Sequence, residues 1–296
     1  MKTASERLYK HVEFLTGIQP ARSFQHLSSL NSVANYIRTN FDALGFSTRL
    51  QTWEISGHSY HNVIASCQPE NKRRLIIGAH YDVCGNQPGA DDNASGVAGL
   101  LELAYQLAAL EYPLPFGIDF VAYSLEEPPF FDSVNMGSYI HASSLDSSTH
   151  EWLGMIALEM IGYFSDEPES QGFYAGFDRT TYSGKGDFIA VVGNTEAPEF
   201  ASAIYAGIVN ARLIDVKKIL FTDSQGLGGM SDHRNYWRMN IPALMINDTA
   251  FLRNPHYHKE TDRIETLNFE KMAAVCLALF ESLQTLENEL SKPEKT

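Results

Sequence analysis

The chain has 296 residues, of which 44% are hydrophobic and 20% are charged, a composition that supports a sizeable folded core and argues against bulk disorder. Its formal net charge of −14 argues against nucleic acid and anionic membranes as partners, because basic patches lead binding to both. The cysteines, Cys67, Cys84 and Cys276, are too few and too scattered to predict a disulfide framework or a structural zinc site.

No apolar run reaches the length of about 18 residues that a membrane-spanning helix needs. The N-terminal stretch MKTASERLYKHVEFL also lacks the long apolar region of a secretory signal. We therefore expect a cytoplasmic protein, while a leader removed from the natural chain would make it secreted or periplasmic.

Residues 1–45 predict two amphipathic helices. Leu8, Val12 and Leu15 share one face of the first, and a longer apolar stripe from Leu27 to Leu44 marks the second. Short runs typical of strands follow, and then a strongly apolar helical pattern. The predicted ranges are strands over 47–55, 61–67 and 73–80, and a helix over 94–110.

The second half continues the alternation of strands and helices. The expected elements are strands over 116–124, 153–162, 186–194 and 241–248, and helices over 197–213 and 269–290. The run over 153–162 is almost wholly apolar, as in a strand buried on both faces. This order predicts an α/β fold, a three-layer αβα sandwich around a mixed, largely parallel sheet. We expect one domain over residues 1–296, with residues 291–296 as a polar tail.

Acidic and histidine side chains gather where the predicted strands end or just beyond. In open α/β sheets, active sites collect outside the carboxyl ends of the strands, so these side chains are expected to share one edge of the sheet. Four separate segments carry them: His80 with Asp82, Glu126 with Glu127, Glu159, and His256 with His258.

The mixture of imidazoles and carboxylates suits zinc or a similar divalent ion. Each group also has an ordinary explanation: a surface ion pair, solvated loop charges, or a helix cap at Asp91 or Asn93. Glu159 is the hardest to explain in this way, because a carboxylate inside an apolar strand costs several kcal/mol unless it is paired or binds a metal. Taken together and in this order, the acidic and histidine side chains favour a metal site.

The motifs together resemble the co-catalytic zinc peptidases, which include bacterial leucyl aminopeptidases and glutamate carboxypeptidase-like enzymes. The matching segments span nearly the whole chain: GAHYD, PGADDNASGVAGLLELA, EE, LEMIGYF, SDH and PHYHKETDRIETL. The combination is specific, although each fragment alone is weak. The resemblance implies a zinc-exopeptidase fold that holds two divalent cations, expected to be zinc.

The resemblance also assigns roles to individual residues. Asp92 is expected to bridge the two ions, Glu126 to act as general base, and Asp82 to orient His80. His258 is preferred over His256 as a ligand, with Asp262 a candidate to hold its ring. A cis peptide is expected between Asp92 and Asn93. The implied metal ligands are His80, Asp92, Glu127, Glu159 and His258.

The implied reaction is amide hydrolysis by a water that the two ions activate. We expect an aminopeptidase acting on peptides with a free N-terminus, with Phe130 or Phe131 lining the substrate pocket. Three alternatives stay open: a carboxypeptidase of the same superfamily, a glutaminyl cyclase-like transferase with a single zinc, and a non-catalytic binding domain. The complete ligand set argues against the last.

Overall fold

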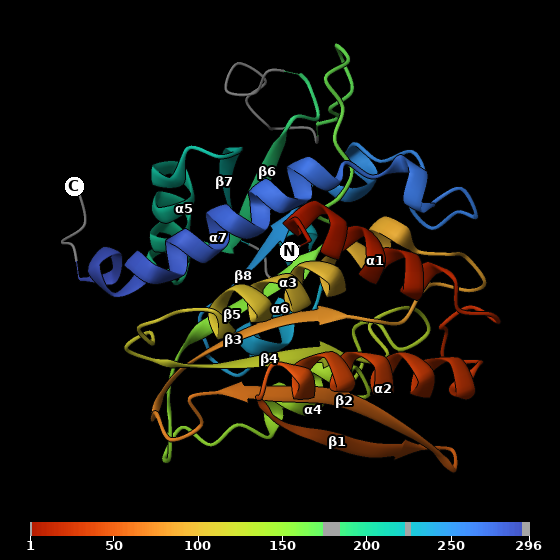
Figure 1. Cartoon of the computed structure of the whole chain (residues 1–296), viewed down its shortest axis with the longest axis horizontal. Helices are drawn as coiled ribbons and strands as arrows, with labels where there is room; N and C mark the ends of the chain where they lie inside the picture. The colour runs from red at the N-terminus through yellow and green to blue at the C-terminus, as the bar shows by residue number, and fades with distance from the viewer. Residues whose placement is uncertain (1, 174–183, 223–225, 292–296) are drawn as a thin grey trace.

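An eight-stranded mixed sheet forms the centre of the computed structural model, which describes residues 2–173, 184–222 and 226–291 (Figure 1). The strand order is β1-β2-β4-β3-β5-β8-β6-β7, and four of the seven pairings are parallel. The strands are β1 (Ser47–Ile55), β2 (His58–Cys67), β3 (Arg73–His80), β4 (Gly117–Tyr123), β5 (Glu151–Glu159), β6 (Phe188–Asn194), β7 (Asp215–Phe221) and β8 (Ala243–Asn247).

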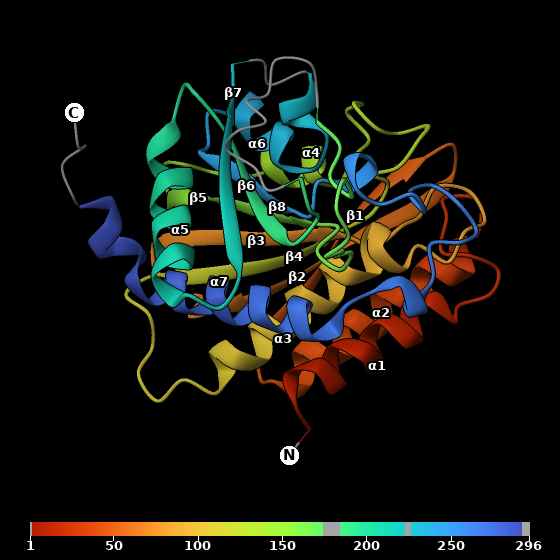
Figure 2. The ribbon, with the colours of Figure 1, turned by 90° about the horizontal axis from the view of Figure 1, so that it is seen from above.

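Helices cover both faces of this sheet (Figure 2). One face carries α1 (Ala4–Thr16), α2 (Leu27–Ala43), α3 (Gly96–Ala108), α5 (Pro198–Ala211) and α7 (Phe269–Leu290). The other face carries the short helices α4 (Gly137–Ser143) and α6 (His233–Arg238). Two separate apolar clusters fill the space between sheet and helices, the larger under the long helices. These three layers and the mixed, largely parallel sheet confirm the predicted fold class.

The elements that the sequence did not predict are short or lie at an edge. They are β7, α4 and α6, together with the single-turn 3₁₀ helices Leu227–Gly229, Ala250–Leu252 and Ile264–Thr266. Of the tail predicted over 291–296, only Ser291 belongs to the described residues, as the C-cap of α7. No helix in the described part of the chain is long and apolar enough to cross a membrane.

The helix predicted over 94–110 begins later than expected. Residues Ala90–Ser95 form a π-helical turn in which Asp92 and Asn93 have non-helical backbone angles, and regular helix starts at Gly96. The side chain of Asn93 accepts a hydrogen bond from the Gly96 N–H (3.1 Å), so it satisfies a donor at the start of α3. The kink places this turn against the end of β5.

Four neighbouring strands position the candidate site. β4, β3, β5 and β8 lie side by side and run parallel, so their carboxyl ends meet at one edge of the sheet. His80 ends β3 and Glu159 ends β5, while Glu126 and Glu127 follow β4 within a few residues. The sheet thus collects side chains from distant parts of the chain at one place.

Candidate metal centre

His80, Asp92 and Glu159 form a buried cluster at this edge. Nε2 of His80 lies 3.3 Å from Oδ1 of Asp92 and 3.3 Å from Oε2 of Glu159. The His80 ring comes from the last residue of β3, and Glu159 from the last residue of the adjacent strand β5. Asp92 reaches the same place from the kinked turn before α3.

A second cluster shares Asp92 with the first. Nε2 of His258 lies 3.1 Å from Oδ2 of Asp92 and 3.3 Å from Oε2 of Glu127. The two oxygens of Asp92 therefore face two different imidazoles. The structure brings together all five side chains that the sequence nominated as metal ligands.

Glu126 lies beside the first cluster. Its Oε2 is 3.9 Å from Nε2 of His80. Leu125 just before it has a positive φ of 63°, so the backbone turns sharply after β4. Neighbouring side chains of a regular strand point to opposite faces, and this turn is what lets Glu126 and Glu127 face one cavity.

Asp82 holds this turn in place through the main chain. Its two oxygens accept hydrogen bonds from the backbone N–H groups of Glu126 and Glu127, both at 3.1 Å. Its Oδ1 also lies 3.6 Å from Nδ1 of His80, which is longer than a hydrogen bond. Asp82 therefore acts on the paired glutamates as well as facing the His80 ring.

Asp262 does not hold the ring of His258, contrary to the expectation from its spacing. Its two oxygens accept hydrogen bonds from the backbone N–H groups of Asp91 (2.9 Å) and Asp92 (3.1 Å). The 3₁₀ turns and loops after β8 direct it toward the π-helical turn instead. The ring of His256 lies 3.0 Å from the Thr261 hydroxyl, whereas the ring of His258 faces Asp92.

The loop between β3 and α3 is tied down by a buried arginine. Arg22 donates hydrogen bonds to the carbonyl oxygens of Gly89 (2.6 Å) and Tyr81 (2.9 Å). Gly89 has a φ of 60°, and an added Cβ would lie 2.3 Å from the Asp92 carbonyl oxygen, so this position requires glycine. The peptide between Asp92 and Asn93 is cis, as predicted.

Burial and charge act in opposite directions on the two imidazoles. Burial lowers the pKa of His258, but the carboxylates of Asp92 and Glu127 outweigh this effect and raise it to about 10. Burial also lowers the pKa of His80, and the surrounding carboxylates, led by Glu159, raise it well above its ordinary value. The cluster therefore attracts positive charge strongly.

The donor set fits divalent cations such as zinc. Burial, together with repulsion from the neighbouring carboxylates, raises the pKa of Glu126 well above its usual range and that of Glu127 to about 7. Oε1 of Glu127 is buried and has no hydrogen-bond partner among the described residues. Carboxylate oxygens and imidazole nitrogens at these positions are ligands that zinc accepts.

Two adjacent cavities border the cluster. The first is lined by the acidic side chains themselves together with Phe131. The second is mostly apolar and shares Glu159, Met230 and Tyr257 with the first; its walls include Phe188, Val192, Met245 and Phe251. A substrate that reaches the cluster thus has an apolar chamber beside it.

The two phenylalanines considered for the substrate pocket lie in different surroundings. Phe131 lines the acidic cavity, with the Arg234 guanidinium 4.9 Å from its ring centroid. Phe130 instead packs edge-on against Phe24, at a centroid distance of 5.4 Å, and contacts Tyr60. Only Phe131 is placed to meet a substrate.

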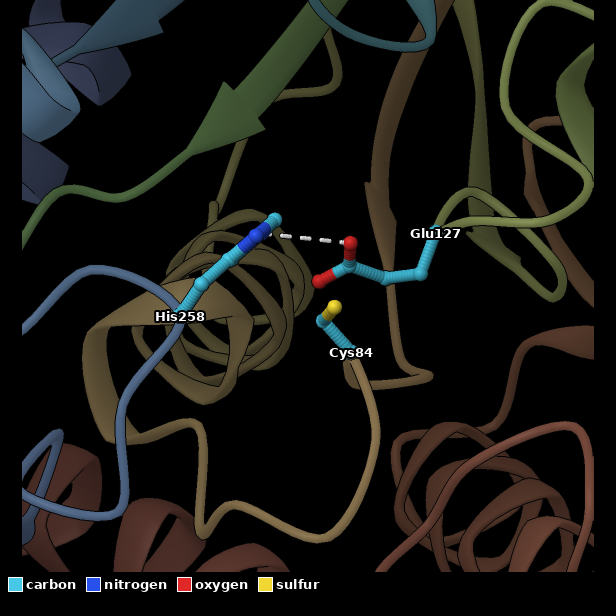
Figure 3. Close-up of side chains that lie close together, drawn as sticks. All are labelled: Cys84, Glu127 and His258. Atoms are coloured by element: carbon cyan, nitrogen blue, oxygen red, sulfur yellow. Dashed lines mark ion pairs between the residues drawn. The ribbon is translucent and has the colours of Figure 1, made fainter.

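Three further side chains contact the candidate metal centre, and the sequence analysis gave none of them a role. Ser231 donates a hydrogen bond to Oε2 of Glu159 (2.7 Å), and the SDH motif was the signal for it. The Tyr257 ring stacks on His258 with centroids 3.8 Å apart. The Cys84 thiol lies beside Glu127 and His258, as Figure 3 shows. A lone cysteine in a loop offers no sequence signal for such a placement.

Comparison with known sequences places the chain among peptidases. The family described as Peptidase family M28 matches residues 62–282. The uncharacterized protein YfbL of Escherichia coli is 41% identical over 278 residues, covering 91% of this chain and 84% of that protein. Leucine aminopeptidase 1 of Fusarium vanettenii is 24% identical over 233 residues and 75% of this chain, which spans about half (52%) of that enzyme.

Solved structures share the fold. The LapA aminopeptidase of Legionella pneumophila superimposes with a TM-score of 0.75 at 20% identity, over 98% of this chain and 73% of that one. The glutaminyl cyclase of Tannerella forsythia gives a TM-score of 0.67 at 21% identity, over 95% of this chain and 98% of that one. Aminopeptidases and glutaminyl cyclases thus share the architecture seen here.

Proposed function

The chain belongs to peptidase family M28, and from that premise we propose that it is a zinc-dependent aminopeptidase that removes apolar residues from the N-termini of peptides. The observation that carries this proposal is the shared carboxylate of Asp92. Its two oxygens face His80 and His258 separately, at 3.3 and 3.1 Å. A carboxylate in this position suits two adjacent cations rather than one.

In this proposal each ion has one imidazole and one further carboxylate besides Asp92. His80 and Glu159 would hold the first ion, and His258 and Glu127 the second. When bound, two divalent cations would lower the pKa of a water toward roughly 7 and polarise the scissile carbonyl. The remaining steps depend on side chains that do not hold metal.

Glu126 is the proposed general base. It is buried at the wall of the acidic cavity, next to the first cluster but outside it. It accepts the proton of the attacking water and returns it to the leaving amine. Asp82 keeps the backbone of Glu126 and Glu127 in the orientation that separates their two roles.

The apolar cavity supports a preference for large apolar N-terminal residues. Its walls from β6 and β8, including Val192 and Met245, carry no charge, and Glu159 of the metal centre also lines it. A leucine or phenylalanine side chain that leaves water for this cavity would stabilise the bound substrate by about 25 cal/mol per Å² of buried apolar area. Distant relatives named leucine aminopeptidases fit the same preference.

Two neighbouring variants test the proposal. Glu126→Gln removes the base but none of the proposed ligands, so it should keep two bound ions and lose on the order of 10²–10⁴ in turnover. Glu127→Gln removes an anionic ligand, so it should lose metal first and recover part of its activity at high zinc. The measurements are metal content after dialysis and turnover across a zinc titration.

Added zinc should restore nothing to Glu126→Gln, which makes it the control for Glu127→Gln. Metal loss in Glu126→Gln with both ions kept in Glu127→Gln would reverse the two assignments. Full activity in both variants would refute the proposed site.

A substrate panel separates the related activities. Peptides with a free N-terminus should be cleaved, whereas N-blocked peptides should not, and blocking the C-terminus should have little effect. Dependence on a free C-terminus would instead indicate a carboxypeptidase. One bound zinc together with cyclisation of N-terminal glutamine would indicate the glutaminyl cyclase reaction, which related structures of this fold make a necessary control.

A further inference from the structure

A thiol stands beside the second cluster of the metal centre. Sγ of Cys84, a carboxylate oxygen of Glu127 and a ring nitrogen of His258 all lie within 4.8 Å of one another. The three side chains come from the loop after β3, the turn after β4 and the loop after β8, and Figure 3 shows them pointing toward a common centre. Zinc accepts all three atom types as ligands.

Glu127 independently indicates that a cation belongs between these groups. Its Oε2 lies 3.3 Å from His258, whereas its Oε1 is buried and accepts no hydrogen bond from any residue that the structure describes. In Figure 3 the oxygen without a dashed line is the one on the side of Cys84. A buried acceptor without a partner is costly, and an ion between it and the sulfur would remove that cost.

We infer that Cys84 is a metal ligand, so that the ion proposed to lie between Glu127 and His258 has four protein ligands, with Asp92 as the fourth. This inference rests on the two-metal function proposed above. As the sulfur–metal bond forms, the thiol gives up its proton to solvent and binds as thiolate.

The inference makes the two proposed sites unequal. The ion held by Glu127 and His258 would have four protein ligands, whereas His80, Asp92 and Glu159 offer the other ion three. Both ions would still share the proposed water, because zinc also accepts a fifth ligand. Glu126 lies beside the site with fewer ligands, 3.9 Å from His80. The Cys84 thiolate and the carboxylates of Asp92, Glu127 and Glu159 together carry four negative charges, which would balance the four positive charges of two divalent ions. A thiolate favours zinc, cobalt and cadmium over manganese and magnesium.

Cobalt(II) titration of the full chain, stripped of metal by a chelator, tests the inference without measuring activity. Visible ligand-field bands report cobalt bound at any site, and a near-ultraviolet charge-transfer band reports cobalt bonded to sulfur. We expect both in the wild-type chain, with proton release on binding. Cys84→Ser should keep the visible bands and lose the charge-transfer band. Cys67→Ser is the matched control, because Cys67 is also half-buried but lines a cavity formed by other residues, and it should keep both.

Visible bands without a charge-transfer band in the wild-type chain would overturn the role of Cys84 and leave the proposed metal centre intact. Absence of both bands would overturn the metal centre itself. If Cys84→Ser fails to fold, alkylation of the wild-type chain resolved by mass spectrometry replaces it. Cobalt should then protect Cys84 and not Cys67, and equal labelling of Cys84 with and without cobalt would contradict the inference.

Discussion

Two buried aspartates of the site act mainly on the main chain. Asp82 accepts hydrogen bonds from the backbone N–H groups of Glu126 and Glu127. Asp262 accepts hydrogen bonds from those of Asp91 and Asp92. In both cases one carboxylate holds the backbone of two adjacent acidic residues. This arrangement determines where the side chains of each pair point, which is what separates a ligand from its neighbour.

Asp82→Asn should therefore weaken both metal binding and folding. The amide places a donor against one of the two backbone N–H groups and leaves it unsatisfied, a loss of about 1–3 kcal/mol in the free energy of unfolding. Metal affinity should fall about 10–100-fold, the usual effect of removing a group that supports ligands. Chelator competition measures the metal affinity, and denaturant unfolding of the metal-stripped protein measures the stability. Unchanged metal affinity with lowered stability would show that Asp82 supports the fold alone.

Residues 128–136, between Glu127 and α4, join the scaffold to the site. Phe130 packs with Phe24 and Tyr60, whereas Phe131 lines the acidic cavity beneath Arg234. Arg234 also pairs with Asp132 at 3.0 Å, which ties the segment to α6. One short segment thus has a packing residue and a cavity residue side by side.

The two phenylalanines predict a matched pair of variants. Phe131→Ala should lower kcat/KM severalfold for leucyl and alanyl substrates alike, with a small change in stability, because Phe131 lines the acidic cavity and not the apolar one proposed to hold the N-terminal side chain. Phe130→Ala should leave kcat/KM unchanged and lower the free energy of unfolding by about 1–3 kcal/mol, since its half-buried ring is lost from the core. Wild-type kinetics in Phe131→Ala across every aminoacyl substrate would remove it from the pocket.

At the scale of the whole molecule, the proposed ions would connect segments far apart in sequence. The ligand candidates span His80 to His258 and stand on β3, on β5, on the turn before α3 and on two loops. A cation that binds them opposes the separation of these segments, and it also offsets the mutual repulsion of the buried carboxylates. Metal binding should therefore be coupled to global stability.

Metal removal tests this coupling. Zinc at about 100 times its Kd should raise the free energy of unfolding by about 2.7 kcal/mol for each site, which corresponds to a rise of several degrees in Tm. The comparison is thermal unfolding with a chelator and then with excess zinc. Glu127→Gln should gain less from zinc than Glu126→Gln. Identical melting curves with and without zinc would argue against a structural contribution from the ions.

The amino-acid sequence by itself determined the fold class and the residue types at the site. Apolar periodicity is a local property, so it located the long helices and the buried strands, and their alternation predicted the three layers. It missed β7, whose edge position tolerates two lysines, and α4 and α6, which are too short to show a helical period. The order of the acidic and histidine motifs carries the resemblance to the zinc peptidases, and that resemblance implied the five ligand candidates that lie together.

Only the tertiary structure decided how those residues face one another. It turned Asp262 to the backbone, placed Phe131 and not Phe130 at the acidic cavity, and set Cys84 beside Glu127. Spacing along the chain does not specify these directions, because they depend on turns whose backbone angles are imposed by contacts between distant segments. The hydrogen bonds of Asp82 and Asp262 are such contacts, and no local pattern encodes them.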